Sequence, residues 1–357
     1  MRTAIIGLPM VGKTSLFQIL TGATRDTHIG STAARTGVAK VPDARLDELA
    51  RLFEPPKVTH AAVEYVDMPS VSKESLRDPA YIASLRVVDA FAHVLRSFED
   101  EIIPHEKGSI DPVRDLEDVE TELILSDLEV VEKRLERLAK DRKKIKNPEL
   151  DREFDLLEKC KAALESNQPL RSLEIGAEEE KRIRGFQFLS RKPMLYVLNL
   201  GESAAGKLHE REKLFREGLL AGRGGVSVTA VCGKIEAELA ELPPEEQREY
   251  LASYGLQESG LERLISATYS LLGLMSFLTA GETEVRAWTI PKNSTAIQAA
   301  GAIHSDFEKK FIRAEVVNWK ALVELGGYPG VREKGLLRLE GKEYTVKDGD
   351  VLVIRHG

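Results

Sequence analysis

The clearest chemical signal in the sequence is the octet from Gly7 to Thr14, which reads Gly-Leu-Pro-Met-Val-Gly-Lys-Thr. It satisfies the phosphate-loop pattern G-x-x-x-x-G-K-S/T. Backbone N–H groups of such a loop, at the start of a helix, cradle the phosphates of a nucleotide. The lysine reaches the β- and γ-phosphates, and the hydroxyl binds Mg²⁺. We predict that the nucleotide is bound by Gly7, Pro9, Met10, Val11, Gly12, Lys13, Thr14 and Ser15.

A second set of residues has the chemistry of a magnesium site. Asp67 closes the β-rich run 61–66, and a carboxylate at a strand end opposite Thr14 holds Mg²⁺ through water in phosphate-loop enzymes. The polar, turn-rich segment 24–36 stands where the first switch loop of an NTPase belongs. Either Ser31 or Thr32 there completes the metal shell in this interpretation, and a plain surface loop is the alternative for each.

The nucleotide base also has a candidate binding element. Asn199-Leu200-Gly201-Glu202 follows an apolar run at 193–198 and matches N-x-x-D/E. An Asp at its last position pairs with the N1–H and 2-amino groups of guanine, and a Glu is longer by about one methylene, so guanine selectivity should weaken. Cys232 and Gly233 follow a strand-like run at 226–231, in the place of the last base-contact loop. We therefore predict base contacts from Asn199, Glu202, Cys232 and Gly233.

The residues that would activate water for hydrolysis are less clear from the sequence. Val71 is the apolar residue at the position where most GTPases carry the Gln that orients the attacking water. Water activation must therefore come from elsewhere or be poor. His105, in the loop predicted for 96–112, is a candidate catalytic residue, and a solvated loop histidine is the alternative.

Composition limits the classes of partner and compartment. The chain has 357 residues, enough for two or three domains, and a net charge of −7, which excludes a generic polyanion binder. We expect no DNA partner, and any RNA contact must come from a local basic patch. With only two cysteines, Cys160 and Cys232, and without an apolar run of about 18 residues, the sequence predicts a cytoplasmic protein with no membrane partner.

The remaining segments predict how the chain is divided. Apolar residues at helical spacing within 115–165, interrupted at 146–148, predict a helical hairpin with a coiled-coil seam and a basic tip at 140–146. That tip is either a solvated helix end or a contact for an RNA backbone. We expect a strand at 87–95, an amphipathic helix at 261–278, a boundary near Gly281, and a compact α+β module with strands that include 344–346. The predicted domains are 1–112 with 191–281, 113–190, and 282–357.

Several further runs carry a resemblance to a known family. They include 41–47 (Val-Pro-Asp-Ala-Arg-Leu-Asp), 235–238, 277–281, and above all 304–316, which reads His-Ser-Asp-Phe-Glu-Lys-Lys-Phe-Ile-Arg-Ala-Glu-Val. Residues 339–344 and 346–350 follow it. Together with the phosphate loop and Asn199 to Glu202, these runs resemble the YchF/Obg-like ATPase family over essentially the whole chain. The resemblance implies an α/β fold: a Ras-like P-loop NTPase core, an α-helical coiled-coil insertion and a C-terminal β-grasp (TGS) domain.

The same resemblance implies a function. The family prefers ATP to GTP because its base motif ends in Glu, binds Mg²⁺, lacks the catalytic Gln, and associates with the ribosome or ribosomal RNA. Four departures from the family pattern lie at catalytic loops: Met10 for Asn, Ser70 for Gly, a different switch sequence at 30–36, and Pro104 at the loop histidine, one residue before His105. We therefore predict a nucleotide-dependent ATPase switch with slow turnover. The alternatives are a nucleotide-binding adaptor with little or no hydrolysis, or a GTPase.

Overall fold

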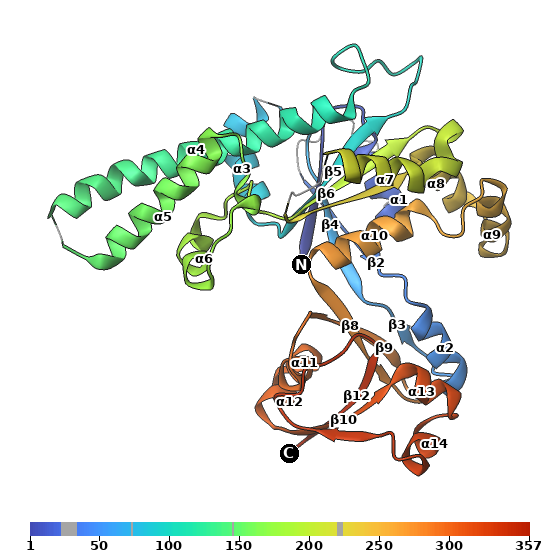
Figure 1. Ribbon diagram of the computed structural model, residues 1–357. Coiled ribbons are helices and arrows are strands. Elements are labelled where there is room, and N and C mark those ends of the chain that lie inside the picture. The colour runs from blue at the N-terminus through green and yellow to red at the C-terminus, as the bar shows by residue number, and fades with distance from the viewer. Residues whose placement is uncertain (23–33, 73, 145, 220–223) are drawn as a thin grey trace. The chain divides into compact units, whose positions relative to one another are not determined.

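The computed structural model describes residues 1–22, 34–72, 74–144, 146–219 and 224–357 (Figure 1). Its contacts divide the chain into two compact units. The first unit comprises Met1–Gly37 and Glu64–Ala267, and the second, which we call the C-terminal unit, comprises Val38–Val63 and Thr268–Gly357. The structure thus groups residues 38–63 with the C-terminal unit, whereas the sequence analysis placed them in the nucleotide-binding segment.

The candidate site is built on a six-stranded sheet with the order β2-β4-β1-β5-β6-β7. Its strands are β1 (Arg2–Ile6), β2 (Arg35–Lys40), β4 (Ala62–Asp67), β5 (Ala90–Ser97), β6 (Met194–Leu200) and β7 (Val226–Val231). The pairs β1–β4, β1–β5, β5–β6 and β6–β7 are parallel, and all seven residues of β6 are buried. Because parallel strands end at one edge of a sheet, the loops after β1, β4, β6 and β7 are brought together there.

Helices cover this sheet, as Figure 1 shows. Besides the two hairpin helices described next, the helices that lie wholly or mainly in the first unit are α1 (Lys13–Thr21), α3 (Pro79–Arg86), α6 (Ala177–Ile183), α7 (Leu208–Leu219), α8 (Gly233–Glu241), α9 (Pro244–Ser253) and α10 (Gly260–Leu271). Short 3₁₀ turns stand at Ser75–Arg77 (η1), Leu170–Ser172 (η2), Arg184–Phe186 (η3) and Glu202–Lys207 (η4). α1 begins directly after the phosphate loop, so its first turn carries Lys13 and Thr14.

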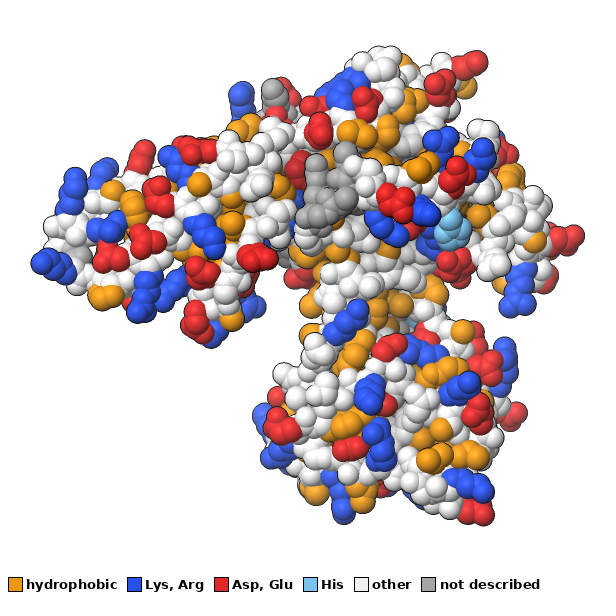
Figure 2. All heavy atoms as spheres, viewed as in Figure 1, with side chains coloured by type: hydrophobic (Ala, Val, Ile, Leu, Met, Phe, Trp, Pro, Cys, Tyr) orange, Lys and Arg blue, Asp and Glu red, His pale blue; other side chains and the backbone are white. Residues whose placement is uncertain are grey.

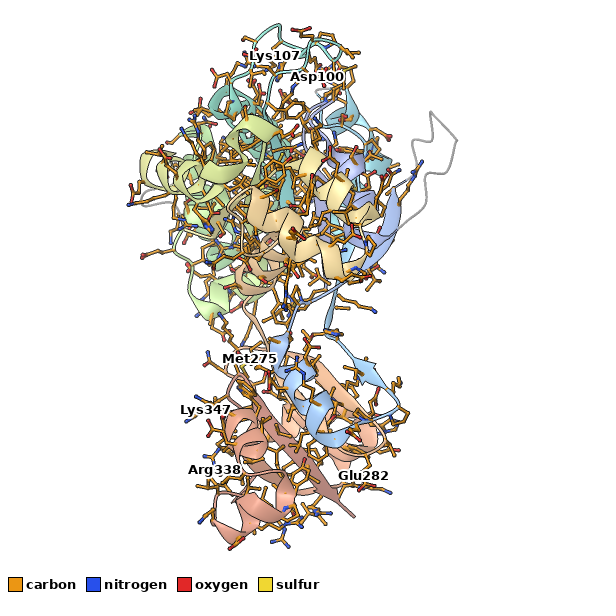
Figure 3. All side chains as sticks on the ribbon, turned by 90° about the vertical axis from the view of Figure 1, so that its right-hand side faces the viewer. Asp100, Lys107, Met275, Glu282, Arg338 and Lys347 are labelled. Atoms are coloured by element: carbon orange, nitrogen blue, oxygen red, sulfur yellow. The ribbon has the colours of Figure 1, made fainter. Side chains whose placement is uncertain are left out.

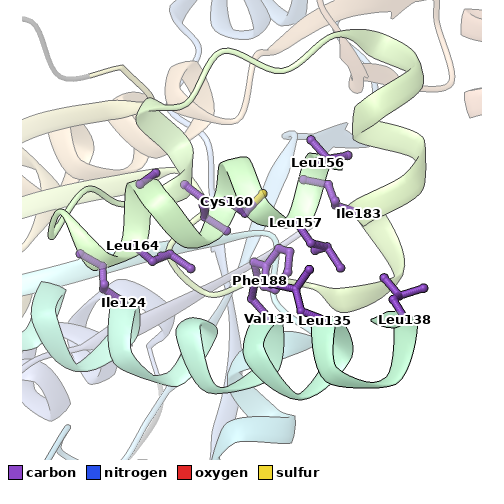
Figure 4. Packing of buried hydrophobic residues seen from close by; sticks show 12 residues of the cluster. Ile124, Val131, Leu135, Leu138, Leu156, Leu157, Cys160, Leu164, Ile183 and Phe188 are labelled. Atoms are coloured by element: carbon purple, nitrogen blue, oxygen red, sulfur yellow. The ribbon is translucent and has the colours of Figure 1, made fainter. Parts of the chain in front are cut away.

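The predicted helical hairpin is present as α4 (Pro112–Lys144) and α5 (Pro148–Glu165). Asn147 caps α5, because its side chain accepts a hydrogen bond from the Glu149 N–H at 3.0 Å, and Pro148 suits the first helical position. The two helices pack through a buried apolar seam that includes Val131, Leu135 and Leu157 (Figure 4). The helical spacing had indicated this apolar core, and α4 also buries three acidic residues, Asp115, Glu120 and Asp127.

The C-terminal unit contains a second six-stranded sheet, of order β11-β10-β12-β8-β9-β3. Its elements are α2 (Ala44–Phe53), β3 (Val58–Thr59), β8 (Leu274–Ala280), β9 (Val285–Pro291), α11 (Ala296–Ile303), α12 (Ser305–Lys309), β10 (Phe311–Asn318), α13 (Trp319–Glu324), α14 (Tyr328–Glu333), β11 (Arg338–Glu340) and β12 (Asp350–His356). Arg45 of α2 pairs with Asp348 at 2.9 Å, so an early helix is tied to a turn near the end of the chain.

Three of the predicted elements differ in the structure. The helix predicted for 261–278 ends at Leu271, because Gly273 takes φ of +65° and the residues that follow form β8. The strand predicted for 344–346 is replaced by an isolated bridge between Thr295 and Thr345. The strand predicted for 87–95 is displaced to Ala90–Ser97. No helix among the described residues is long and apolar enough to cross a membrane.

Candidate nucleotide site

The phosphate loop has a backbone that only glycine fits at two positions. Gly7 and Gly12 have φ of 146° and 96°, and Met10 between them has φ of 58°. A Cβ on Gly7 would lie 2.6 Å from the Val94 carbonyl oxygen, and one on Gly12 would lie 2.5 Å from Asn199 Nδ2. The Val94 backbone and the Asn199 side chain therefore fill the space that a Cβ would take, and the loop forms the open cradle that a phosphate requires.

Lys13 is held inside this loop. Its side chain is 7% exposed, and its ammonium donates hydrogen bonds to the Leu8 carbonyl at 2.7 Å and to Ser70 Oγ at 3.0 Å. Burial lowers the pKa of Lys13 to about 8, and the carboxylates of Asp67 and Glu106 oppose that shift. The ammonium is thus positioned by neutral oxygens, which a triphosphate can replace.

Asp67 and Thr14 form the metal side of the site. Asp67 is 8% exposed, and its buried Oδ1 has no hydrogen-bond partner among the described residues. Burial raises the pKa of this carboxyl, while a hydrogen bond with Thr14 and the charge of Lys13 lower it. Oxygen donors of this kind suit Mg²⁺, which keeps several waters and takes few protein ligands. A lone buried carboxylate oxygen beside a hydroxyl fits such an ion. Ser31 and Thr32 lie outside the described residues.

Asn199 joins the phosphate loop to the predicted base loop. Its Nδ2 donates to the Val11 carbonyl at 2.9 Å, and its Oδ1 accepts from the Gly233 N–H at 3.0 Å. The side chain is 5% exposed. We call this pair of hydrogen bonds the Asn199 bridge. It holds the loop after β1 against the start of α8. The distance between the predicted phosphate-binding loop and the predicted base-binding loop is thereby fixed.

The Glu202 and Cys232 side chains differ in whether they are available to contact a nucleotide base. The Cys232 side chain is buried in a small core with Ala205 and Ile235, and burial raises the pKa of its thiol. The Glu202 carboxylate accepts hydrogen bonds from Lys234 and, at 3.0 Å, from the hydroxyl of Tyr254. Those two bonds lower the pKa of Glu202, with Lys234 the larger cause. Of the predicted base residues, Glu202 therefore presents its side chain at the loop, whereas Cys232 packs inward.

Known proteins resemble this chain over nearly its whole length. Residues 2–134 match a family model described as a 50S ribosome-binding GTPase, and residues 274–357 match the YchF-GTPase_C model, described as a protein of unknown function. The Ribosome-binding ATPase YchF of Bacillus subtilis is 42% identical over 358 residues, with 98% of each chain covered. The Escherichia coli O157:H7 protein of the same name is 39% identical over 360 residues, again with 98% of each chain covered.

A solved structure agrees with these relatives. The Schizosaccharomyces pombe YchF GTPase superposes with a TM-score of 0.83 at 29% identity, and the match covers 99% of this chain and 97% of that one. The chain belongs to the YchF family. The resemblance seen in the sequence is thereby confirmed, as are the NTPase core, the helical region and the C-terminal domain. A member of this P-loop family is a nucleotide-binding protein.

Within this YchF chain, His105 pairs with the carboxylate of Asp115. Its Nε2 lies 2.8 Å from Asp115 Oδ2, its Nδ1 accepts from the Lys107 N–H at 3.1 Å, and its side chain is 5% exposed. The loop that carries it runs past Asp100 and Lys107 (Figure 3) and is held by Arg96, which donates to the Ile103 carbonyl at 2.7 Å. His105 is therefore neither solvated nor free at a ring nitrogen in this conformation, and its catalytic role stays a prediction.

Sequence reasoning missed three residues of this region. Ser70 was named only as a departure from the family's Gly, yet its hydroxyl accepts a hydrogen bond from Lys13. Tyr254 directly follows α9, 52 residues beyond the Glu202 that it contacts, and no motif marks it. His93 of β5 is 1% exposed, lies behind Gly7, and has a pKa lowered to about 3 by burial and by Lys13. A histidine in the middle of the apolar run 90–95 was the one signal that could have found it.

Proposed function

We propose that this protein is a Mg²⁺-dependent ATPase switch that works at the ribosome. The observation that carries the proposal is the Asn199 bridge, which sets a phosphate loop with a buried lysine against a base loop. Relatives about 40% identical are named ribosome-binding ATPases, which supports both parts of the proposal.

Each predicted residue has a chemical task in this proposal. Lys13 would neutralise charge on the β- and γ-phosphates, and the backbone N–H groups of residues 7–15 would donate to their oxygens. Thr14 and Asp67 would hold Mg²⁺, which supplies further charge neutralisation on the phosphates when bound. Asn199 would keep the loops in register, while Glu202 would contact the base.

The base specificity follows from Glu202. A carboxylate placed one methylene beyond the usual Asp position is mismatched to the two donors of guanine, so we propose ATP as the preferred nucleotide. The printed names of the similar proteins differ on this point, since the solved structure is named a GTPase and the relatives are named ATPases. The preference is therefore a quantity to measure.

The test is calorimetric titration of ATP and of GTP, each with Mg²⁺, into protein stripped of nucleotide. We expect ATP to bind at least tenfold more tightly, a difference of about 1.4 kcal/mol. Lys13→Ala should abolish binding, whereas Lys40→Ala, a change of the same kind at an exposed lysine, should leave it intact. Tight ATP binding by the Lys13→Ala protein would refute the site, and GTP binding as tight as ATP would support the GTPase alternative.

The ribosome contact is proposed for the hairpin tip. Lys140, Lys143, Lys144 and Lys146 are exposed there, and Figure 2 shows Lys and Arg side chains at the outer end of the hairpin. Exposed cations that contact phosphates give binding that weakens steeply with salt. Alanine at Lys143 and Lys144 should reduce co-sedimentation with 70S ribosomes and reduce its salt dependence. Alanine at the exposed Lys207 and Lys213 is the matched control, and an equal loss in both double variants would count against the tip.

A second candidate function is an adaptor that binds ATP with little hydrolysis. It is favoured by the buried Val71 at the Gln position, 2% exposed, and by His105, whose two ring nitrogens are engaged. ATP would then stabilise one arrangement of the chain without being cleaved. Single-turnover release of phosphate that disappears in Lys13→Ala protein would exclude the adaptor.

A further inference from the structure

Glu202 is held from both of its oxygens. Lys234 of α8 donates to Oε2, and the hydroxyl of Tyr254, the residue after α9, donates to Oε1 at 3.0 Å. The three side chains come from three places in the first unit, namely the start of η4, the first turn of α8 and the residue that follows α9. We call this arrangement the Glu202 clamp. A carboxylate bonded at both oxygens cannot turn without losing one of the two bonds.

Tyr254 is itself fixed in place. Its ring meets that of Tyr250 edge-on, with centroids 5.4 Å apart, and both rings pack against the core of Ala205, Cys232 and Ile235. The Tyr250 hydroxyl bonds to Glu238 and to the Tyr254 hydroxyl, whereas its bonds do not include one to Glu202. The two tyrosines therefore share their packing but differ in the carboxylate that they reach, which gives a matched pair for experiment.

Guanine and adenine differ in the hydrogen-bond donors that they offer to the Glu202 carboxylate. Guanine offers two adjacent donors, N1–H and the 2-amino group, so it needs both oxygens of a carboxylate turned into the plane of the base. Adenine offers only its 6-amino group and needs one acceptor. An ammonium at Oε2 also compensates the charge that would attract the second guanine donor.

We propose that Tyr254 and Lys234 are specificity-determining residues, which hold the Glu202 carboxylate so that it serves the single donor of adenine and cannot be re-aimed toward guanine. This inference rests on the proposed nucleotide site. It extends the specificity from one residue in the base motif to two residues that position it. For guanine to bind in the bidentate manner, the carboxylate must turn toward both donors, and such a turn breaks one bond of the clamp.

The test measures the ratio of GTP and ATP dissociation constants by titration with Mg²⁺. Tyr254→Phe keeps the ring and removes one hydroxyl, and Lys234→Met keeps the length of the side chain and removes the charge. Because Glu202 and Lys234 are exposed, solvent screens their interaction, so each variant should lower the ratio of the GTP to the ATP dissociation constant about threefold to fivefold. Tyr250→Phe loses its bonds to Glu238 and to the Tyr254 hydroxyl but removes no bond to Glu202, so it should change the ratio less than Tyr254→Phe does.

The ratio separates a specificity role from a merely structural one, because loosened packing weakens both nucleotides alike. Ratios within twofold of the wild-type value in both Tyr254→Phe and Lys234→Met would overturn the proposal. An equal change in Tyr250→Phe would overturn it as well. Wild-type protein that binds both nucleotides equally would refute the clamp while the nucleotide site stands, and protein that binds neither would refute both.

Discussion

The protonation of Lys13 sets an upper pH limit on nucleotide binding. Burial lowers its pKa to about 8 in the nucleotide-free protein, against the opposing charges of Asp67 and Glu106. A triphosphate binds the ammonium form, so the bound state has the higher pKa. Affinity is therefore full below pH 8 and falls as the pH rises through that value. At pH 9 only about one molecule in ten is protonated, so the dissociation constant should rise about tenfold, or about 1.4 kcal/mol.

The assay is calorimetric titration of Mg²⁺–ATP at pH 7, 8 and 9, repeated in buffers of different ionisation enthalpy. Proton uptake on binding should be close to none at pH 7 and approach one proton at pH 9. Lys13→Arg is the control, because a guanidinium stays charged over this range and any residual affinity should not depend on pH. A wild-type affinity that stays constant from pH 7 to 9, with no proton uptake, would refute the reasoning.

Three further predictions concern stability, each measured by urea unfolding. Gly12→Ala should cost about 2 kcal/mol, because its Cβ would lie 2.5 Å from Asn199 Nδ2 at a φ of 96°, and a cost near zero would contradict this geometry. Leu157→Ala, at a fully buried position of the hairpin seam, should cost about 2–5 kcal/mol, and a smaller loss would mean that the seam is loosely packed. His93 has a pKa of about 3 when folded and about 6.5 when unfolded, so the unfolded state takes up its proton first and folding loses about 2 kcal/mol between pH 7.5 and 5. His93→Leu should remove that loss, and an unchanged pH dependence would rule it out.

The phosphate loop could be predicted from sequence because its conformation is local. Gly7 and Gly12 stand where φ is positive, and Lys13 and Thr14 begin the helix that follows at once. The hairpin was predictable for a similar reason, since helical spacing and the Asn147-Pro148 start signal act within a few residues. In both cases neighbours along the chain determine the conformation.

The sequence-based predictions fail where contacts with residues far away in the sequence determine the local structure. Residues 274–280 continue a helical apolar pattern, yet they pair with β9 and become β8, because a sheet elsewhere in the chain satisfies their backbone. α2 shows the same effect: its buried Leu46 and Leu49 and its Arg45 belong to the C-terminal unit, and Arg45 reaches Asp348 across 303 residues of sequence. Tyr254 at the Glu202 clamp is a third case. No local pattern contains such contacts.

Binding and hydrolysis depend on different groups in this chain, and they can be tested apart. Lys13 and Asn199 are each fixed by hydrogen bonds to backbone carbonyls, so the binding geometry exists without a partner. Val71 is apolar at the place where a water-orienting Gln would stand, and His105 is engaged at both ring nitrogens. If an ATPase of this design turns over slowly alone, the group that orients water is supplied on docking. We therefore expect ribosomes to accelerate single-turnover phosphate release without a matching change in ATP affinity. Release at an unchanged rate would place water activation within the chain itself.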